Sequence, residues 1–280
     1  MSELGGAELT SVRSPRVKAA RQLAKRALRE RARSFLAEGP QAVSEALAQG
    51  GVVTQLFLTG AARARYAGLA AQASRQGAEV NTVSGEVMAE LAQTITPQGV
   101  LAVCRFVDVP LAELTGAAPR LAVILASVRD PGNAGTVLRT ADAAGAQGVV
   151  FSDASVDPNN SKCVRASAGS IFHLPLVLGG RVAETVACLR EAGLRVLAAD
   201  GAAGRSLDEI EPSGLLREPT AWLFGNEAWG LPADLLALAD EAVAVPIYGQ
   251  AESLNLAAAA AVCLYASARA QRVPSQRAMS

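Results

Sequence analysis

The segment Leu121 to Ala126 is an uninterrupted run of six apolar residues. A strand with one face in water alternates polar and apolar residues, so this run indicates a strand that is covered on both faces. Such strands belong to parallel sheets with helices on each side. Five further short apolar segments predict strands, at 149–151, 174–178, 195–199, 220–224 and 242–246. Helical patterns separate several of them, at 133–144, 162–167, 182–192 and 253–271. Residues 120–280 therefore predict an α/β domain with a parallel sheet.

Residues 1–108 predict a second, smaller α/β domain, and 280 residues are enough for two domains. Its predicted strands begin at Phe35 and cover 52–58, 79–83 and 99–106. Its predicted helices cover 14–33, 40–48, 61–76 and 86–93. Residues 109–119 contain two prolines and Gly116, and this composition predicts a linker between the domains.

Positive charge is concentrated at the beginning of a chain whose formal net charge is zero. Residues 1–34 hold nine Lys or Arg and three Glu, and only Glu30 lies within the predicted helix to pair with its cations. An ordinary solvated helix is one interpretation. The scarcity of acidic partners favours contact with nucleic-acid phosphates. The candidate RNA-binding residues of this helix are Arg16, Lys18, Arg21, Lys25, Arg26 and Arg29.

Several common functional classes lack support in this sequence. No G-x-G-x-x-G loop follows a strand, and no Walker A loop is present. The four cysteines are too far apart for a zinc or redox motif, so buried free thiols are predicted. The single histidine, His173, has apolar neighbours, which favours a core or supporting role over catalysis. A metal site is not expected.

No segment predicts attachment to a membrane. The longest apolar stretch, Leu256 to Ala266, is shorter than a bilayer requires, and no apolar signal region opens the chain. These features predict a cytoplasmic protein.

The first of three polar clusters extends from Asp130 to Thr140, directly after the apolar run. It should therefore lie at the carboxyl edge of the parallel sheet, where α/β proteins place their sites. Asn133 is a plausible helix cap, and Arg139 follows six residues later, so both can flank one pocket. Arg139 is equally suited to a surface pair with Asp142, and spacing alone leaves both interpretations open.

Two more polar clusters follow predicted strands. In Leu223 to Pro232, Gly225 and Gly230 permit close backbone approach on either side of Glu227, although a tight turn with a solvated Glu has the same composition. In Val245 to Asn255, a polar loop leads into a helix for which Ser253 is a simple N-cap.

Together the clusters resemble the three motifs of the SpoU (TrmH-like) branch of the SPOUT methyltransferases. The matching patterns are N-x5-R-T-A at 133–141, G-N-E-x-x-G at 225–230 and P-x5-E-S-L-N at 246–255. The segment 164–175 also follows the family pattern, and the resemblance covers 121–270. Residues 12–105 are similar, less specifically, to the family's ribosomal-protein-like (L30e-like) substrate-binding domain.

The resemblance implies a six-stranded parallel sheet with a C-terminal trefoil knot, and a homodimer. It implies S-adenosylmethionine as the cofactor, held chiefly by backbone groups of the loops. The cofactor-binding residues implied for this chain are Gly225, Asn226, Val245, Pro246, Ile247 and Leu254, with Asp200 and Gly201 as further candidates.

The resemblance also implies a reaction, the transfer of a methyl group to a ribose 2′-hydroxyl of RNA, with 23S ribosomal RNA as the favoured substrate. The resemblance assigns Arg139 to activating the hydroxyl, either as a base or by electrostatic stabilisation and positioning. The second role is favoured, because a guanidinium stays protonated at neutral pH. The motif residues Asn133, Glu227, Ser253 and Asn255 complete the catalytic set, and Arg165 is a candidate phosphate contact. Ribose methylation of transfer RNA, and a non-catalytic role in RNA binding or ribosome assembly, are the alternatives.

Overall fold

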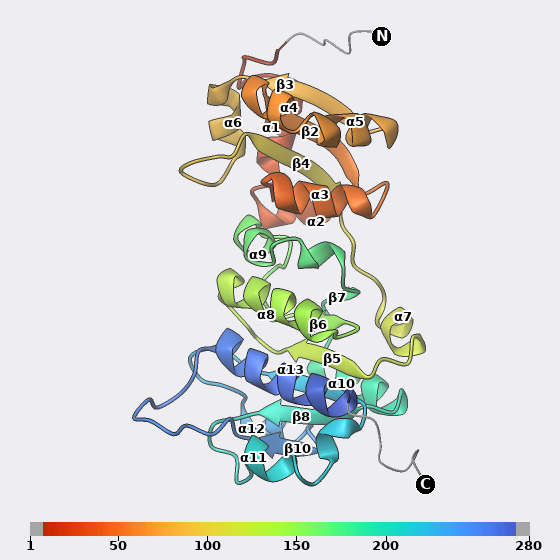
Figure 1. Ribbon diagram of the computed structural model, residues 1–280, viewed down its shortest axis with the longest axis vertical. Coiled ribbons are helices and arrows are strands. Elements are labelled where there is room, and N and C mark those ends of the chain that lie inside the picture. The colour runs from red at the N-terminus through yellow and green to blue at the C-terminus, as the bar shows by residue number, and fades with distance from the viewer. Residues whose placement is uncertain (1–7, 273–280) are drawn as a thin grey trace. The chain divides into compact units, whose positions relative to one another are not determined.

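The computed structural model of the protein describes residues 8–272 and divides into two compact units (Figure 1). The first unit contains the chain up to Val107 together with Asp157–His173. The second contains Asp108–Val156 and the chain from Leu174 onward. The outer ends of the predicted domains, residues 1–7 and 273–280, lie outside the described residues.

The second unit is built on a six-stranded sheet with the order β10-β8-β9-β5-β6-β7, in which every neighbouring pair is parallel. Its strands are β5 (Leu121–Leu125), β6 (Val149–Phe151), β7 (Leu176–Leu178), β8 (Arg195–Ala199), β9 (Thr220–Phe224) and β10 (Glu241–Val243). The parallel α/β domain and the six-stranded sheet are confirmed. The trefoil knot stays a prediction.

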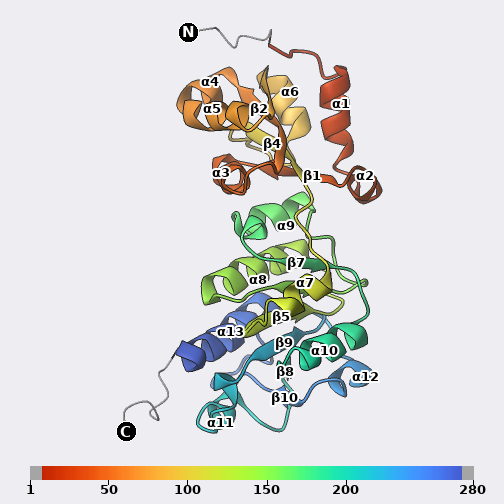
Figure 2. The ribbon, with the colours of Figure 1, turned by 90° about the vertical axis from the view of Figure 1, so that its right-hand side faces the viewer.

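Helices cover both faces of this sheet, which explains the apolar run in β5. Figure 2 shows α8 (Pro131–Ala144) and α13 (Leu256–Arg272) on one face and α10 (Val182–Glu191) on the other. Ile124 packs with Val186 of α10. On the opposite face Trp222 is fully buried, and its indole nitrogen donates a hydrogen bond of 2.9 Å to Ser267 Oγ of α13. This unit also contains two short helices, α11 (Leu207–Ile210) and α12 (Ala233–Leu236), and a 3₁₀ turn at Leu215–Arg217.

The segment predicted as a linker, 109–119, contains helix α7 (Leu111–Gly116). Leu114 of this helix is buried against Val150 and Val177 of the sheet. The two prolines lie at the helix boundaries, where proline is well tolerated, Pro110 at the N-cap and Pro119 beyond the C-terminal end. The segment is therefore packed within the second unit.

The first unit has a four-stranded sheet with the order β1-β4-β2-β3, in which β2 and β3 are parallel and the other neighbours antiparallel. The strands are β1 (Ser34–Glu38), β2 (Val53–Thr59), β3 (Glu79–Val83) and β4 (Val100–Arg105). The helices are α1 (Pro15–Gln22), α2 (Arg26–Ala32), α3 (Pro40–Ala48), α4 (Gly60–Arg65), α5 (Ala67–Arg75) and α6 (Gly85–Leu91). In Figure 2, α1 and α6 lie on one face of this sheet and α3, α4 and α5 on the other. The smaller α/β domain is confirmed.

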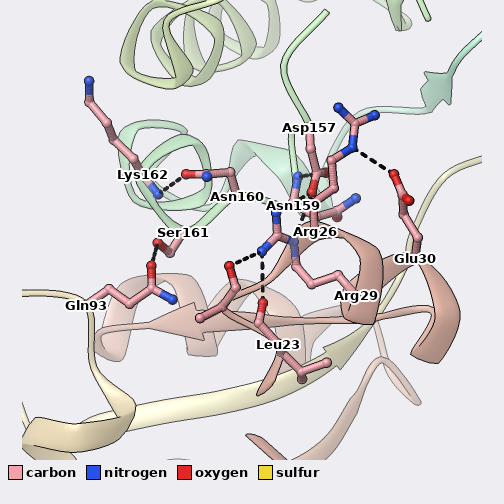
Figure 3. Close-up of polar contacts among 11 residues, drawn as sticks. Leu23, Arg26, Arg29, Glu30, Gln93, Asp157, Asn159, Asn160, Ser161 and Lys162 are labelled. Carbon is pink, nitrogen blue, oxygen red and sulfur yellow. Dashed lines mark hydrogen bonds and ion pairs between the residues drawn. The ribbon is translucent and has the colours of Figure 1, made fainter. Parts of the chain in front are cut away.

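The predicted helix 14–33 is two helices, because Arg29 folds back onto the turn between them. Its Nη1 donates to the carbonyl oxygens of Leu23 at 2.9 Å and Ala24 at 2.8 Å, satisfying groups that a continuous helix would pair itself (Figure 3). Its Nε and Nη2 donate to Asp157 Oδ2 at 2.9 and 2.6 Å. Arg29 is only 3% exposed, so the prediction that it contacts RNA phosphate is wrong. The predicted helix 61–76 is likewise interrupted, at Tyr66.

Residues 157–173, predicted as part of the catalytic domain, pack within the first unit. This segment contains α9 (Ser161–Ala166) and a 3₁₀ turn at Ser170–Phe172. The Phe172 ring stacks on Phe35 of β1, with ring centroids 5.8 Å apart. His173 is exposed, and its Nε2 lies 3.2 Å from Glu45 Oε2, so the prediction of a core histidine is wrong. Apolar side chains on this connection, rather than its place in the sequence, determine where it packs.

Replacing Asp157 with asparagine is expected to lower the free energy of unfolding by about 3–5 kcal/mol, because it leaves the buried Arg29 charge without a counter-ion. The double variant Arg29→Met/Asp157→Leu should recover part of this loss, since it buries no charge, although the Leu23 and Ala24 carbonyls and the Asn159 N–H lose these partners. Urea denaturation measures both quantities. A loss under about 1 kcal/mol in Asp157→Asn, the range of an exposed pair, contradicts this account.

Candidate active site

A cavity of about 270 Å³ opens in the second unit at the carboxyl ends of β8, β9 and β10. This is the edge at which parallel sheets bind ligands. Its apolar lining includes Phe224, Val243, Leu254 and Leu256, and its carboxylates are Asp200, Glu227 and Glu252. The cavity is thus an apolar pocket with a few polar groups, as ligand sites commonly are.

The cavity brings together residues from three separate loops. Of the eight predicted cofactor-binding residues, all except Pro246 line it: Asp200, Gly201, Gly225, Asn226, Val245, Ile247 and Leu254. Two of the predicted catalytic residues, Glu227 and Ser253, also line it.

The loop after β9 closes on its own backbone. Asn226 N–H donates to the Gly230 carbonyl and Gly230 N–H to the Asn226 carbonyl, both at 2.9 Å. A Cβ placed on Gly225 would lie 2.4 Å from the carbonyl carbon and oxygen of Gly230, where no side chain fits. Only glycine fits at position 225, because any side chain there would collide with the backbone of Gly230.

Hydrogen bonds join the three polar clusters into one network. Asn133 Nδ2 donates to Glu227 Oε1 at 3.3 Å, and Asn255 Nδ2 donates to Asn133 Oδ1 at 3.0 Å. The Glu227 carboxylate also accepts the backbone N–H groups of Arg129 at 3.1 Å and Asp130 at 2.9 Å. One side chain from each cluster therefore holds the three loops together.

Two predicted helix caps are replaced by neighbouring residues. Asp130 caps α8, because its Oδ1 accepts the Asn133 N–H at 2.8 Å. Asn133 is therefore not the cap, and its side chain is free to join the network. Helix α13 begins at Leu256, and Asn255 Oδ1 accepts the Ala257 N–H at 2.9 Å. Ser253 is consequently not the cap either.

The backbone between β5 and α8 is held by serines that sequence reasoning missed. Ser127 has a φ of +57°, which is uncommon for a residue with a side chain. Its N–H donates to Ser152 Oγ at 3.1 Å, and its carbonyl accepts Asn226 Nδ2 at 2.8 Å. The next residue, Val128, donates its N–H to Ser155 Oγ at 3.3 Å. The signal was the serine pair directly after the apolar strand 149–151.

Arg139 lies on the exposed side of α8 and does not line the cavity. Within residues 8–272 its guanidinium makes no hydrogen bond or ion pair, so the alternative pairing with Asp142 is not formed. The Arg139 guanidinium therefore offers an exposed positive charge to which a ligand can bind.

The basic side chains of α1 and α2 have more acidic partners than the sequence suggested. Exposed ion pairs join Arg16 to Glu79 at 2.6 Å, Arg26 to Glu30 at 2.7 Å, and Arg21 to Glu90. Glu79 and Glu90 are distant in sequence, which is why local spacing did not reveal them. Arg165 Nη1 lies 3.4 Å from Glu38 Oε2 in the first unit. Lys18 and Lys25 are exposed and make no ion pair within residues 8–272.

The carboxyl of Glu227 should make the loops sensitive to acid. Partial burial by itself raises the pKa of this carboxyl, but the N–H groups of Arg129 and Asp130 and the Asn133 amide outweigh it and hold the pKa below the ordinary 4.5. A lowered pKa stabilises the folded state above pH 4.5, and this stability is lost as the pH falls through the folded-state pKa.

Glu227→Gln is therefore expected to lower the melting temperature at pH 7, by an amount equivalent to about 1 kcal/mol because the group is exposed on one side. The difference between the natural protein and the variant should shrink below pH 4.5. Calorimetry between pH 3 and pH 8 tests this expectation. A difference that is constant across that range contradicts it.

The four cysteines form no disulfide and belong to no metal-ligand cluster within the described residues. Cys104, Cys163 and Cys263 are buried and outside any disulfide, as predicted, whereas Cys188 is outside any disulfide but partly exposed. Burial raises the pKa of Cys263 to about 12. Between residues 8 and 272, no three His, Cys, Asp or Glu side chains gather as metal ligands. No helix in the same range combines the length and apolarity needed to cross a membrane.

Two family models match the chain. The SpoU rRNA Methylase family model matches residues 120–265, which include the cavity and the network. The MRM3-like substrate binding domain model matches residues 14–102, within the first unit.

Curated relatives match over most of their length. The 23S rRNA (guanosine(2553)-2′-O)-methyltransferase RlmP of Bacillus subtilis is 34% identical over 258 residues, which are 92% of this chain and 98% of that protein. The 23S rRNA (uridine(2479)-2′-O)-methyltransferase of Streptomyces viridochromogenes is 32% identical, with coverage of 91% and 89%.

Solved structures agree with these matches. An AdoMet-bound rRNA methyltransferase from Sinorhizobium meliloti superimposes with a TM-score of 0.82 and 33% identity, covering 96% of this chain and 99% of that one. The SpoU methyltransferase AviRb from Streptomyces viridochromogenes, in complex with AdoMet, gives a TM-score of 0.78 and 28% identity, covering 94% and 100%. By its family model, its relatives and its fold, the chain belongs to the SpoU rRNA methylase family.

Proposed function

We propose that the protein transfers a methyl group from S-adenosylmethionine to a ribose 2′-hydroxyl of 23S ribosomal RNA. The observation that carries this proposal is the network of Glu227, Asn133 and Asn255, which joins the three family motifs beside the cavity. The names of the relatives support the same reaction class and substrate.

The cavity fits S-adenosylmethionine in the chemistry of its lining. An adenine ring suits the apolar side chains of Val243, Ile247 and Leu254, and the Asp200 carboxylate offers acceptors for hydroxyl or amino groups. The closed loop at Gly225 presents backbone groups without an intervening side chain. When bound, the cofactor supplies an electrophilic methyl group on a positively charged sulfur.

The residues of this chain orient the reacting groups and stabilise charge. The Arg139 guanidinium supplies positive charge that stabilises the negative charge developing on the ribose oxygen. The amides of Asn133 and Asn255 fix the loops between substrate and cofactor, and Glu227 holds both the Asn133 side chain and the backbone before α8. Ser253 contributes a hydroxyl to the cavity wall.

The first unit selects the RNA in this proposal. Its match to a substrate-binding domain and the exposed cations of α1 and α2 support that role. Lys18 and Lys25 have no ion pair within residues 8–272, and Arg16, Arg21 and Arg26 are held only in exposed pairs, which are weak and exchangeable. Arg165 is a further phosphate contact, although its pairing with Glu38 must compete with RNA.

Reversing two of these charges, in Lys18→Glu/Lys25→Glu, should weaken RNA binding about tenfold at 0.1 M salt and flatten its salt dependence. Each lost phosphate contact reduces the slope of log K against log salt by about 0.7–0.9. Filter binding at four salt concentrations measures both effects. Arg75→Glu, an exposed cation on α5 of the same unit, is the matched control and should change neither. An equal effect of Arg75→Glu would assign the loss to net charge alone.

A cytoplasmic homodimer completes the proposal. Large apolar side chains are exposed on the second unit, with Trp229 62% and Tyr248 84% exposed beside the cavity loops. Val262 and Tyr265 on α13 are 44% and 46% exposed. Exposed apolar surface of this kind commonly marks an interface, and a second copy of the chain is the partner we propose.

Methyl transfer from tritiated S-adenosylmethionine to total bacterial RNA tests the function. We expect label on ribose in the 23S fraction. Label in transfer RNA would make transfer RNA the substrate in place of 23S RNA. Label on a base would contradict the proposed ribose methylation. Failure to bind S-adenosylmethionine would favour a non-catalytic RNA-binding role.

A further inference from the structure

We infer that Arg29 and Asp157 are positioning residues. They couple the basic helices α1 and α2 to residues 126–130, the loop between β5 and α8, which we call the motif loop. The inference rests on the proposed function, because its kinetic readout is methyl transfer to RNA. Neither residue lines the cavity, so each acts through the chain that it holds.

The first part of the coupling is a buried, fully bonded ion pair. The side chains of Arg29 and Asp157 are 4% and 8% exposed, and Asp157 Oδ2 accepts both Nε and Nη2 of Arg29 (Figure 3). The other carboxylate oxygen accepts the Asn159 N–H at 2.8 Å. Because both oxygens and four guanidinium hydrogen bonds are engaged, the pair has one geometry.

The pair also determines the shape of the basic segment. Arg29 Nη1 holds the carbonyls of Leu23 and Ala24, the turn that separates α1 from α2. That turn is followed by Lys25 and Arg26, two of the exposed cations proposed to contact RNA. The Arg29–Asp157 pair therefore holds the turn that precedes these cations, while the cations themselves stay exposed.

Asp157 directly follows Ser155 and Val156, which hydrogen-bond to the motif loop. Val156 N–H donates to the Val128 carbonyl at 2.8 Å, and Ser155 Oγ accepts the Val128 N–H at 3.3 Å. The two residues after Val128, Arg129 and Asp130, donate their N–H groups to Glu227. Ser155 and Val156, the two residues before Asp157, thus hold the loop that leads into α8 and Asn133.

A second contact on the same segment reinforces its attachment. Ser161 Oγ donates to Gln93 Oε1 at 2.5 Å, and Asn160 Oδ1 accepts the Lys162 N–H at 2.9 Å to cap α9 (Figure 3). These contacts lie farther along the chain from Val156 than Asp157 does. After Val156, which bonds to the motif loop, Asp157 is therefore the next residue along the chain and the one that bonds to Arg29.

The test compares three full-length variants with the natural protein. Asp157→Asn keeps the shape of the side chain and removes its charge. Arg29→Met/Asp157→Leu restores packing without the directed bonds to Leu23 and Ala24. Leu56→Ala, in a fully buried position of β2, destabilises the same unit by a cavity without touching the ion pair and serves as the control.

Three readouts separate positioning from stability, all taken at a temperature where every variant is folded. They are the single-turnover rate with saturating 23S RNA and S-adenosylmethionine, the dissociation constants for both, and amide hydrogen exchange of residues 126–132. In Asp157→Asn we expect a rate at least tenfold lower, dissociation constants within threefold, and exchange at least tenfold faster. The double variant should regain part of the lost melting temperature but none of the rate, and Leu56→Ala should keep both rate and exchange.

Two results would overturn the inference: recovery of the rate together with melting temperature in the double variant, or an equal loss of rate in Leu56→Ala. If the natural protein transfers no methyl to RNA, the proposed function fails. Hydrogen exchange then decides the coupling by itself, and unchanged exchange in Asp157→Asn refutes it.

Discussion

Replacing Arg139 with alanine is expected to lower the methyl-transfer rate constant by about 10²–10³-fold, the usual cost of removing a group that stabilises a developing oxyanion. The affinity for S-adenosylmethionine should change by less than about twofold, since Arg139 does not line the cavity. Folding stability should also be unaffected, because the guanidinium has no ion pair within residues 8–272 to lose. Single-turnover kinetics, calorimetric titration of the cofactor and a melting curve provide the three measurements.

Arg181→Ala is the matched control. Arg181 is another highly exposed arginine of the second unit, in a long contact of 3.9 Å with Glu184, and should retain full activity when replaced. Arg139→Lys distinguishes a simple positive charge from the bidentate guanidinium, and partial rescue is expected if charge dominates. Full activity in Arg139→Ala would remove Arg139 from the mechanism.

Gly225→Ala is expected to weaken S-adenosylmethionine binding about 100-fold, close to the upper end of the roughly 1–3 kcal/mol that overpacking by a methyl group costs. The added Cβ would meet backbone atoms of Gly230 at 2.4 Å, and backbone cannot rotate away as a side chain can. Relief requires breaking the paired hydrogen bonds between Asn226 and Gly230, and this loop lines the cavity. Equilibrium dialysis against labelled cofactor measures the effect.

Gly204→Ala provides the comparison for this variant. Gly204 lies in the loop after β8, and a Cβ there has nothing within 4 Å. It should bind the cofactor normally and melt within about a degree of the natural protein. Retained affinity in Gly225→Ala would show that the loop can rearrange and that its closed form is not what binds.

Much of the second unit could be predicted from sequence because its signals are local. The strands at 195–199 and 220–224 were predicted to the residue, since continuous apolar runs mark buried parallel strands. The three polar clusters lie at the predicted carboxyl edge for the same reason. Motif spacing, however, did not reveal that Asn133, Glu227 and Asn255 share hydrogen bonds.

What sequence reasoning missed depends on distant partners. The break between α1 and α2 is caused by Arg29, whose partner Asp157 is 128 residues away. The caps at Asp130 and Asn255 were assigned to Asn133 and Ser253, because several residues of each cluster are good cap formers and local preference does not rank them. In each case the choice was decided by side-chain geometry that only the folded chain provides.

The passage of the chain between the units at 107–108, 156–157 and 173–174 has a consequence for modularity. A recognition module joined by a single tether can be exchanged between enzymes by one cut and one ligation. This module is made of two separate sequence segments, with part of the catalytic fold encoded between them. Phe35 of the first segment stacks on Phe172 of the second, which follows β6 in the sequence. A fragment that starts near residue 108 would expose Phe172 and orphan Asp157. Recombination that changes target specificity must therefore replace residues 157–173 together with the amino-terminal module, so specificity is inherited as two coordinated pieces.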